Sequence, residues 1–184
     1  MNKSNKTRIA FFIGTLNIGG AERHLLNLIN NLDREKYSID LYLLSEKGKL
    51  FDQLDSYIRV FAPNKTISHK ISHLVNFIRT LIRIKITNPQ IIHCFLPQAY
   101  LFGGFIGYLL KNNNVIMSRR SLNYYQDNYK FIPVRRLERF LHKRSRYILV
   151  NSKAVYKDII HEGVPKSKIK LIYNGVIENK RKLL

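Results

Sequence analysis

The chain has 184 residues, of which 45% are hydrophobic and 11% aromatic, so it can bury the core of one globular domain without disulfides or metals. Its single cysteine, Cys94, excludes an internal disulfide and is compatible with a reducing compartment. The formal net charge is +20, and residues 111–184 carry 18 basic and 5 acidic side chains. Such a charge favours a phosphate-bearing partner (anionic lipid, nucleic acid or a phosphorylated substrate), unless it is simply a solvated basic surface.

Two apolar runs resemble export or membrane signals. The run Ile9–Ile13 follows basic residues, but Gly14 ends it and no small-residue cleavage site follows, so we do not interpret it as a signal peptide. The run Ala99–Leu110 is shorter than the roughly 20 residues that a bilayer requires. We therefore expect a cytoplasmic protein, soluble or peripheral on the inner face of a membrane. No spacing of His, Cys or carboxylate residues is typical of a metal site.

Seven short β-rich runs alternate with helical patterns along the chain. They are Arg8–Ile13, Ser38–Leu44, Tyr57–Ala62, Ile91–Phe95, Val115–Ser118, Tyr147–Val150 and Lys170–Tyr173. Several are continuously apolar, which is typical of strands covered on both faces. This alternation predicts an α/β fold in which helices flank a Rossmann-like, doubly wound and mainly parallel sheet. We find no internal repeat or linker, and expect a single domain over residues 1–184.

Apolar residues at helical spacing predict four helices between these strands. Their apolar stripes cover Ala21–Leu32, Ile71–Ile82, Val134–Leu141 and a segment from Ser152 to about His161. Pro133 suits a first helical turn, and Ser152 suits an N-cap.

Ligands of doubly wound sheets bind at the carboxyl ends of the strands, which draws attention first to the loop after Ile13. Gly19 and Gly20 would let a ligand approach the backbone closely, and the helix N-terminus behind them suits a phosphate or carboxylate. The loop matches neither a Walker motif nor the dinucleotide fingerprint. A tight turn without a ligand is the alternative interpretation.

Two later strand ends carry polar side chains. His93 lies near the end of an apolar strand, where it is either a satisfied core residue or part of a ligand cleft. Ser118, Arg119 and Arg120 end the next strand. Paired arginines are good phosphate ligands because each guanidinium presents a rigid fork of donors, but they can also be solvated charges.

Five blocks, taken in order, resemble the N-terminal domain of family-4-type retaining glycosyltransferases. They are Gly-Gly-Ala-Glu-Arg at 19–23, Ile-Ile-His-Cys-Phe-Leu-Pro at 91–97, Ser-Arg-Arg-Ser-Leu-Asn at 118–123, Asn-Ser-Lys-Ala at 151–154 with Glu-Gly-Val-Pro at 162–165, and Ile-Tyr-Asn-Gly-Val at 172–176. The resemblance spans residues 9–176.

This resemblance implies one half of a GT-B fold, in which the first domain binds mainly the acceptor and the second binds a nucleotide-sugar. It further implies transfer with retention of configuration, with no metal or other cofactor. By the same resemblance, Gly19 and Gly20 would face the donor diphosphate or the transferred sugar. Ser118, Arg119 and Arg120 would bind an anionic acceptor or a phosphate, and His93 would line the cleft as the one candidate for a catalytic group.

The motifs of a donor-binding half do not occur in this sequence, which ends in an exit segment at 171–184. We therefore expect the isolated chain to be catalytically inert and to require a nucleotide-sugar-binding domain or subunit. The alternatives are a non-catalytic scaffold that anchors such a subunit, or a truncated remnant.

Basic residues accompany two of the predicted helices. Arg79, Arg83 and Lys85 lie near the stripe Ile71–Ile82, and the segment Tyr124–Arg146 combines tyrosines with arginines. Both patterns suit an anionic membrane and a lipid-linked or envelope saccharide acceptor, unless the stripes pack on the sheet. The pI of 10.2 also fits a nucleic-acid-binding module, which we disfavour because no such motif is present.

Overall fold

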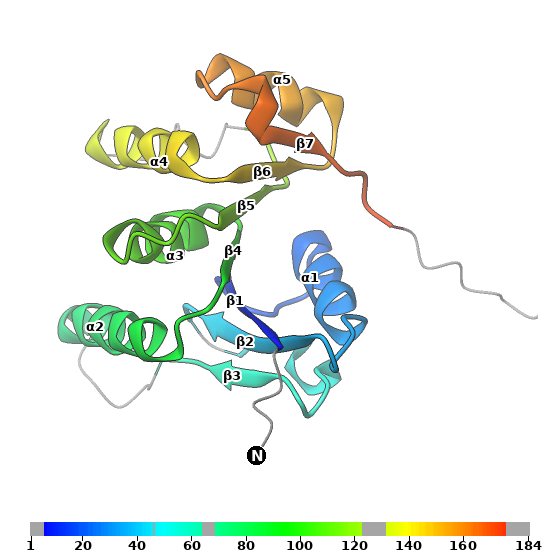
Figure 1. The fold of residues 1–184 in the computed structure, drawn as a ribbon, viewed down its shortest axis with the longest axis vertical. Coiled ribbons are helices and arrows are strands. Elements are labelled where there is room, and N and C mark those ends of the chain that lie inside the picture. Colours follow the sequence, from blue (N-terminus) through cyan, green and yellow to red (C-terminus); the bar gives the residue numbers. More distant parts are fainter. Residues whose placement is uncertain (1–5, 46, 64–68, 123–131, 176–184) are drawn as a thin grey trace, which may run out of the picture.

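The computed structural model describes residues 6–45, 47–63, 69–122 and 132–175. Seven parallel strands form one sheet in the order β3-β2-β1-β4-β5-β6-β7 (Figure 1). The strands are β1 (Thr7–Ile13), β2 (Tyr37–Leu43), β3 (Arg59–Phe61), β4 (Ile91–Phe95), β5 (Val115–Arg119), β6 (Tyr147–Val150) and β7 (Ile169–Leu171). All seven predicted strands are present, and the predicted Rossmann-like α/β fold is confirmed.

Five helices flank the sheet. They are α1 (Gly20–Asn30), α2 (His69–Thr87), α3 (Pro97–Leu109), α4 (Ile132–Arg144) and α5 (Lys153–His161), with short 3₁₀ turns at Phe51–Gln53 and Lys166–Lys168. Ser152 caps α5 as predicted, since its side chain accepts a hydrogen bond from the Val155 amide. Within the described residues, none of the helices combines the length and apolarity needed to cross a membrane.

The helices divide between the two faces of the sheet because successive strand residues point to opposite sides. On one face, α1 packs against Phe11 and its neighbours. On the other, α2, α3 and α4 pack against Phe12 and Cys94, and Figure 1 shows these three helices stacked along one side. Helix α5 packs on Ile148 and Val150. These residues are in register with Met117 and Arg119 of β5, so α5 shares the face of α3 and α4.

The strand order places a topological switch point between β1 and β4. The chain moves from β1 outward to β2 and β3, then crosses back to β4 on the other side of β1. In doubly wound folds the connections leave in opposite directions on either side of such a point, and ligands bind at the carboxyl ends of the two strands that flank it. The glycine loop after β1 and the segment after β4 therefore flank the place where such folds bind ligands.

Helix α2 packs on the sheet along only part of its predicted apolar stripe. Phe77, Leu81 and Ile84 pack on the core. Leu74, Ile78 and Ile82 of the predicted stripe are instead exposed by 62%, 45% and 52%. Helix α2 has apolar residues on more than one side, so periodicity alone could not select the packed face.

Candidate functional site

The candidate site lies at the carboxyl ends of β4 and β5, on the face of the sheet that α1 covers. His93 of β4 and Ser118 of β5 share that face and are both buried. His93 Nε2 lies 2.8 Å from Ser118 Oγ, within hydrogen-bonding distance. The Tyr100 hydroxyl donates a 2.6 Å hydrogen bond to the Ser118 carbonyl from the opposite side. Ser118 is thus fixed through both its side chain and its backbone.

The His93 imidazole is neutral across the physiological pH range. Burial, together with the nearby charges of Arg120 and His24, lowers the pKa of His93 to about 3. A neutral imidazole donates one hydrogen bond and accepts another, and Ser118 takes one of these two roles. The ring can therefore orient a hydroxyl, but it adds no positive charge to the site.

We expect the folded chain to lose stability through His93 as the pH falls from about 6.5 toward 3. An unfolded histidine has a pKa near 6.5, above the folded value of about 3, so the unfolded state binds more protons in this window. The free energy of unfolding therefore falls by up to about 1.4 kcal/mol for each pH unit in this window. Urea unfolding at pH 7, 6 and 5 should show a steeper pH dependence for the wild type than for His93→Gln. Parallel pH profiles for the two proteins would contradict the buried neutral imidazole.

Arg120 follows the end of β5 and is the cation of the candidate site. Its Nη1 donates a hydrogen bond to Asn174 Oδ1, and its guanidinium lies 5.8 Å from the centroid of the Phe95 ring. Burial lowers the pKa of Arg120, and burial together with Arg120 lowers the pKa of His24. The buried Arg120 Nε has no hydrogen-bond partner among the described residues.

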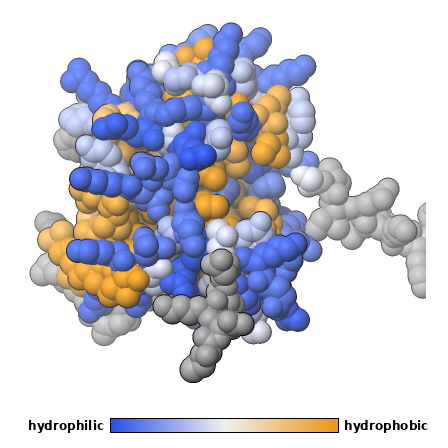
Figure 2. All heavy atoms as spheres, viewed as in Figure 1, coloured by the Kyte–Doolittle hydropathy of each residue, from blue (hydrophilic) through white to orange (hydrophobic). Residues whose placement is uncertain are grey.

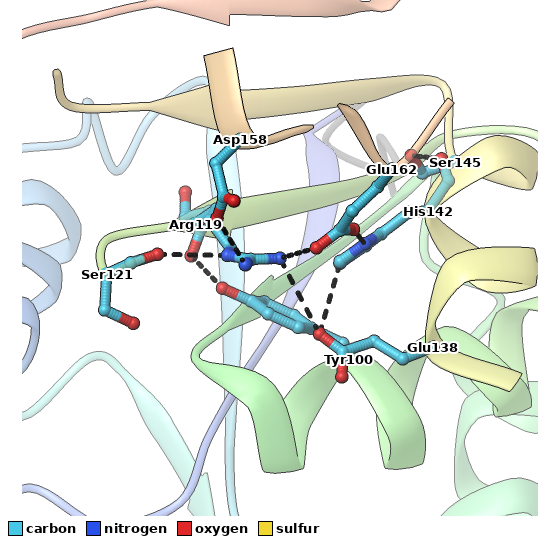
Figure 3. Close-up of polar contacts among 9 residues, drawn as sticks. Tyr100, Arg119, Ser121, Glu138, His142, Ser145, Asp158 and Glu162 are labelled. Atoms are coloured by element: carbon cyan, nitrogen blue, oxygen red, sulfur yellow. Dashed lines mark hydrogen bonds and ion pairs between the residues drawn. The ribbon is translucent and has the colours of Figure 1, made fainter. Parts of the chain in front are cut away.

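Arg119 points to the opposite face of the sheet and is fully buried between α4 and α5 (Figure 3). Its Nη1 lies 2.9 Å from Glu162 Oε1, and its Nη2 lies 3.0 Å from Asp158 Oδ2. Glu138 Oε1 lies 3.9 Å from Nη1. Arg119 Nε donates a 3.0 Å hydrogen bond to the Ser121 carbonyl. The guanidinium therefore joins both helices to the loop that carries Arg120.

His142 completes this buried network. Its Nδ1 lies 2.9 Å from Glu162 Oε2, and its Nε2 lies 3.7 Å from Glu138 Oε1. Burial raises the pKa of Glu162, but the hydrogen bonds and charges of His142 and Arg119 outweigh this effect and hold that pKa below its ordinary value. These partners are not among the residues that the sequence motifs single out. The i, i+4 spacings of Glu138 with His142 and of Asp158 with Glu162 are the signal that could have revealed them.

The glycine loop contributes backbone to the same edge of the sheet. Gly19 is the N-cap of α1, in extended conformation and without a side-chain cap, and the Glu22 carboxylate folds back over it. A Cβ atom on Gly20 would meet nothing within 4 Å, so the first turn of α1 is open to a ligand. Gln98, at the start of α3, lies against Gly14 and joins this loop to the β4 side of the switch point.

The structure thus separates the predicted site residues into two groups. His93, Ser118 and Arg120 meet on the α1 face, with Gly19 and Gly20 at the same edge of the sheet. Arg119 lies beneath them on the other face. Asn123 and the residues 124–131 of the predicted aromatic segment lie outside the described residues. In the described part of the chain, no group of His, Cys, Asp and Glu side chains is placed to bind a metal ion.

Comparison with known proteins identifies the family and the fold. The sequence model of glycosyltransferase family 4 matches residues 18–180. No curated protein matches the sequence significantly. Among solved structures, Anabaena Alr3699/HepE in complex with UDP-glucose is similar with a TM-score of 0.70 at 18% identity, over 92% of this chain and 44% of that protein.

Two further structures share the fold. Sucrose-phosphate synthase from Thermosynechococcus elongatus matches with a TM-score of 0.62 at 14% identity, over 93% of this chain and 49% of its own. UDP-GlcNAc 2-epimerase from Methanocaldococcus jannaschii matches with a TM-score of 0.61 at 16% identity, over 91% of this chain and 45% of its own. The chain therefore spans less than half the length of these proteins. Because one of them is an epimerase, the shared architecture does not by itself define a reaction.

Proposed function

This chain belongs to glycosyltransferase family 4, and from that premise we propose that it is the acceptor-side half of a sugar-transferring enzyme. The proposed reaction moves a sugar from a nucleotide-sugar to a saccharide acceptor, with the donor held mainly by a second domain or subunit. The observation that carries the proposal is the grouping of His93, Ser118 and Arg120 at the carboxyl edge of the sheet, beside the open glycine loop.

Each group has a role that follows from its chemistry. The open N-terminus of α1 at Gly19 and Gly20 would approach the donor diphosphate, because free helix amides and the helix dipole favour anions. Arg120 would stabilise negative charge on that diphosphate or on an anionic acceptor. The neutral His93, held by Ser118, would orient an acceptor hydroxyl. Arg119 would act indirectly, by fixing the loop from which Arg120 projects.

The second half of the enzyme is part of the proposal. The solved structure of HepE holds UDP-glucose, and this chain covers 44% of that protein. Stabilising the leaving diphosphate requires donors preorganised around it, and the proposed site supplies donors from one side. We infer that residues 1–184 form one acceptor-side domain and that residues 171–184 lead toward the donor-binding half.

Helix α2, on the face opposite to α1, supports the proposal that the protein binds peripherally to a membrane. Leu74, Ile78, Ile82 and Ile86 are exposed in a row at four-residue spacing, and Figure 2 shows apolar surface over the region where α2 lies in Figure 1. Helix α2 contains no acidic residue. An apolar row flanked by basic residues suits the interface of an anionic leaflet. Co-flotation with phosphatidylglycerol vesicles at low salt is expected, and the protein should remain unbound to phosphatidylcholine vesicles.

The proposed reaction is tested with the purified chain and with whatever protein co-purifies from its native cells. Nucleotide-sugars, beginning with UDP-glucose, are supplied together with membranes from the same cells as acceptor. We expect no transfer by the chain alone and donor-dependent transfer once a donor-binding partner is present. Transfer by the chain alone would refute the need for a second half. A chain that remains without a partner and inert would be a remnant or a scaffold.

Replacing Gly20 with valine is expected to reduce transfer by the complemented enzyme at least about tenfold, because the branched side chain would fill the space left for the donor. The same change should alter the free energy of unfolding by less than about 1 kcal/mol, since a Cβ atom there meets nothing within 4 Å. Unaltered transfer by a stable Gly20→Val variant would exclude this loop from the donor site.

A further inference from the structure

A groove lies between α2 and the surface formed by β2, β3 and α3. It is separate from the carboxyl-edge site, which is the group of His93, Ser118 and Arg120. The groove has a volume of about 1420 Å³. One end reaches Ser45 and Gln98, and both of these residues contact Gly14 of the glycine loop. The other end reaches Ile86 and Thr87 at the end of α2. The groove therefore connects the donor-facing loop with the exposed apolar row of α2.

The wall of this groove is aromatic. Tyr42 and Phe61 lie with their ring centroids 4.9 Å apart, and Phe77 and Phe102 meet edge to face at 5.4 Å. All four residues line the groove. Apolar and aromatic walls stabilise a bound hydrocarbon chain by removing it from water, by about 0.8 kcal/mol for each buried CH₂ group.

The charged groups that line the groove are all basic. They are Lys47, Arg59, Arg79 and Arg83, and none of the described residues that line the groove is an Asp or Glu. Arg59 is already balanced, because it forms an ion pair with the buried Asp40. The Arg83 guanidinium lies 4.1 Å from the centroid of the Phe61 ring, as a cation over an aromatic face does. Lys47 and Arg79 are exposed, and no described carboxylate forms a salt bridge with either of them.

We propose that this groove binds one lipid phosphate, with its hydrocarbon chain along the aromatic wall and its phosphate beside Lys47 and Arg79. An aromatic groove whose described charged groups are all basic complements a molecule that has both an apolar chain and a negative head group. The idea rests on the proposed function in one respect: the bound lipid would carry the acceptor sugar to the carboxyl edge at Ser45 and Gln98. The binding itself requires no donor half and no catalysis.

The chain contains no tryptophan, which permits a specific optical test on the full chain. Ile86 is 76% exposed and lies at the outer end of the groove, so Ile86→Trp introduces a single reporter that leaves the core intact. Titration with farnesyl phosphate below its critical micelle concentration should shift the emission of this tryptophan to shorter wavelength. Farnesol and inorganic phosphate are the matched control probes. Farnesol has the hydrocarbon chain without the phosphate, and inorganic phosphate has no hydrocarbon chain.

Charge reversal separates the groove from general attraction to a basic protein. In the Ile86→Trp background, Lys47→Glu and Arg79→Glu are each expected to weaken farnesyl phosphate binding at least about tenfold. Arg136→Glu, an exposed arginine of α4 outside the groove, makes the same change in net charge and should alter binding less than about twofold.

The outcomes distinguish the two proposals. No spectral response to farnesyl phosphate, an equal response to inorganic phosphate, or equal weakening by Arg136→Glu would overturn the lipid groove. Specific binding without sugar transfer in the complemented assay would leave the groove in place and reject the proposed function. Transfer to a lipid-free saccharide, unaffected by Lys47→Glu and Arg79→Glu, would support the transferase and contradict the groove's role as its acceptor site.

Discussion

Replacing Arg119 with methionine is expected to lower the free energy of unfolding by about 3–5 kcal/mol, the cost of removing one partner from a buried ion network. The fully buried guanidinium lies 2.9 Å from Glu162 and 3.0 Å from Asp158, with Glu138 at 3.9 Å. Without it, carboxylates of α4 and α5 face one another in a low-dielectric interior. Urea unfolding at pH 7, with the m-value compared between variants, measures the effect.

The neighbouring arginine provides the matched control. Arg120→Met removes the same functional group one residue away, but Arg120 is only partly buried and contacts Asn174 rather than a carboxylate. Its cost should stay below about 1.5 kcal/mol, that of a single hydrogen bond. The loss of unfolding free energy in Arg119→Lys should lie between those of the two methionine variants. Lysine keeps the positive charge but lacks the planar guanidinium that donates to two carboxylates at once. Equal losses for Arg119→Met and Arg120→Met would show that the buried network does not stabilise the fold as described.

Gly103→Ala is expected to destabilise the fold by about 1–3 kcal/mol, although alanine is the better helix former by about 1 kcal/mol. A Cβ atom at Gly103 of α3 would lie 2.7 Å from Phe12 Cγ and 2.8 Å from Cys94 Sγ. Both neighbours are fully buried on adjacent strands, so neither can move aside without shifting the sheet. Thermal or urea unfolding of the variant measures the loss.

Gly20→Ala serves as the control for this steric argument. Gly20 is also helical, but its added Cβ atom would meet nothing within 4 Å, so Gly20→Ala should not lower the free energy of unfolding and should raise it by at most about 1 kcal/mol, the difference in helix propensity. If Gly103→Ala is as stable as the wild type, α3 does not pack on the sheet as closely as the structure places it.

Much of the fold follows from sequence patterns, because buried parallel strands are short apolar runs between helices. All seven strands were predicted to within about two residues at each end, which is the ordinary uncertainty of boundaries. Helix α3 was not predicted as a helix. Its segment is apolar on every side and contains three glycines, so it shows no amphipathic period that would predict a helix.

The candidate site was less predictable, because side-chain direction depends on register. Arg119 and Arg120 are equivalent in sequence, yet the alternation of a strand sends the first between α4 and α5 and leaves the second beside Phe95. Their position at the end of a strand predicts a role in a ligand site for both arginines. It does not indicate which face of the sheet each side chain occupies. The partners of Arg119 come from residues 138–162, and only the packing of α4 and α5 brings them together.

The most direct test of the account is donor-dependent sugar transfer by the chain complemented with its donor-binding partner, comparing Arg120→Ala with Arg136→Ala. Arg120 lies at the carboxyl-edge site beside Phe95, whereas Arg136 is exposed on α4. If the carboxyl edge of this sheet is half of a transferase site, Arg120→Ala reduces transfer by about 100-fold and Arg136→Ala leaves it unchanged. Equal rates for the two variants, or transfer by the chain without a partner, would contradict the account.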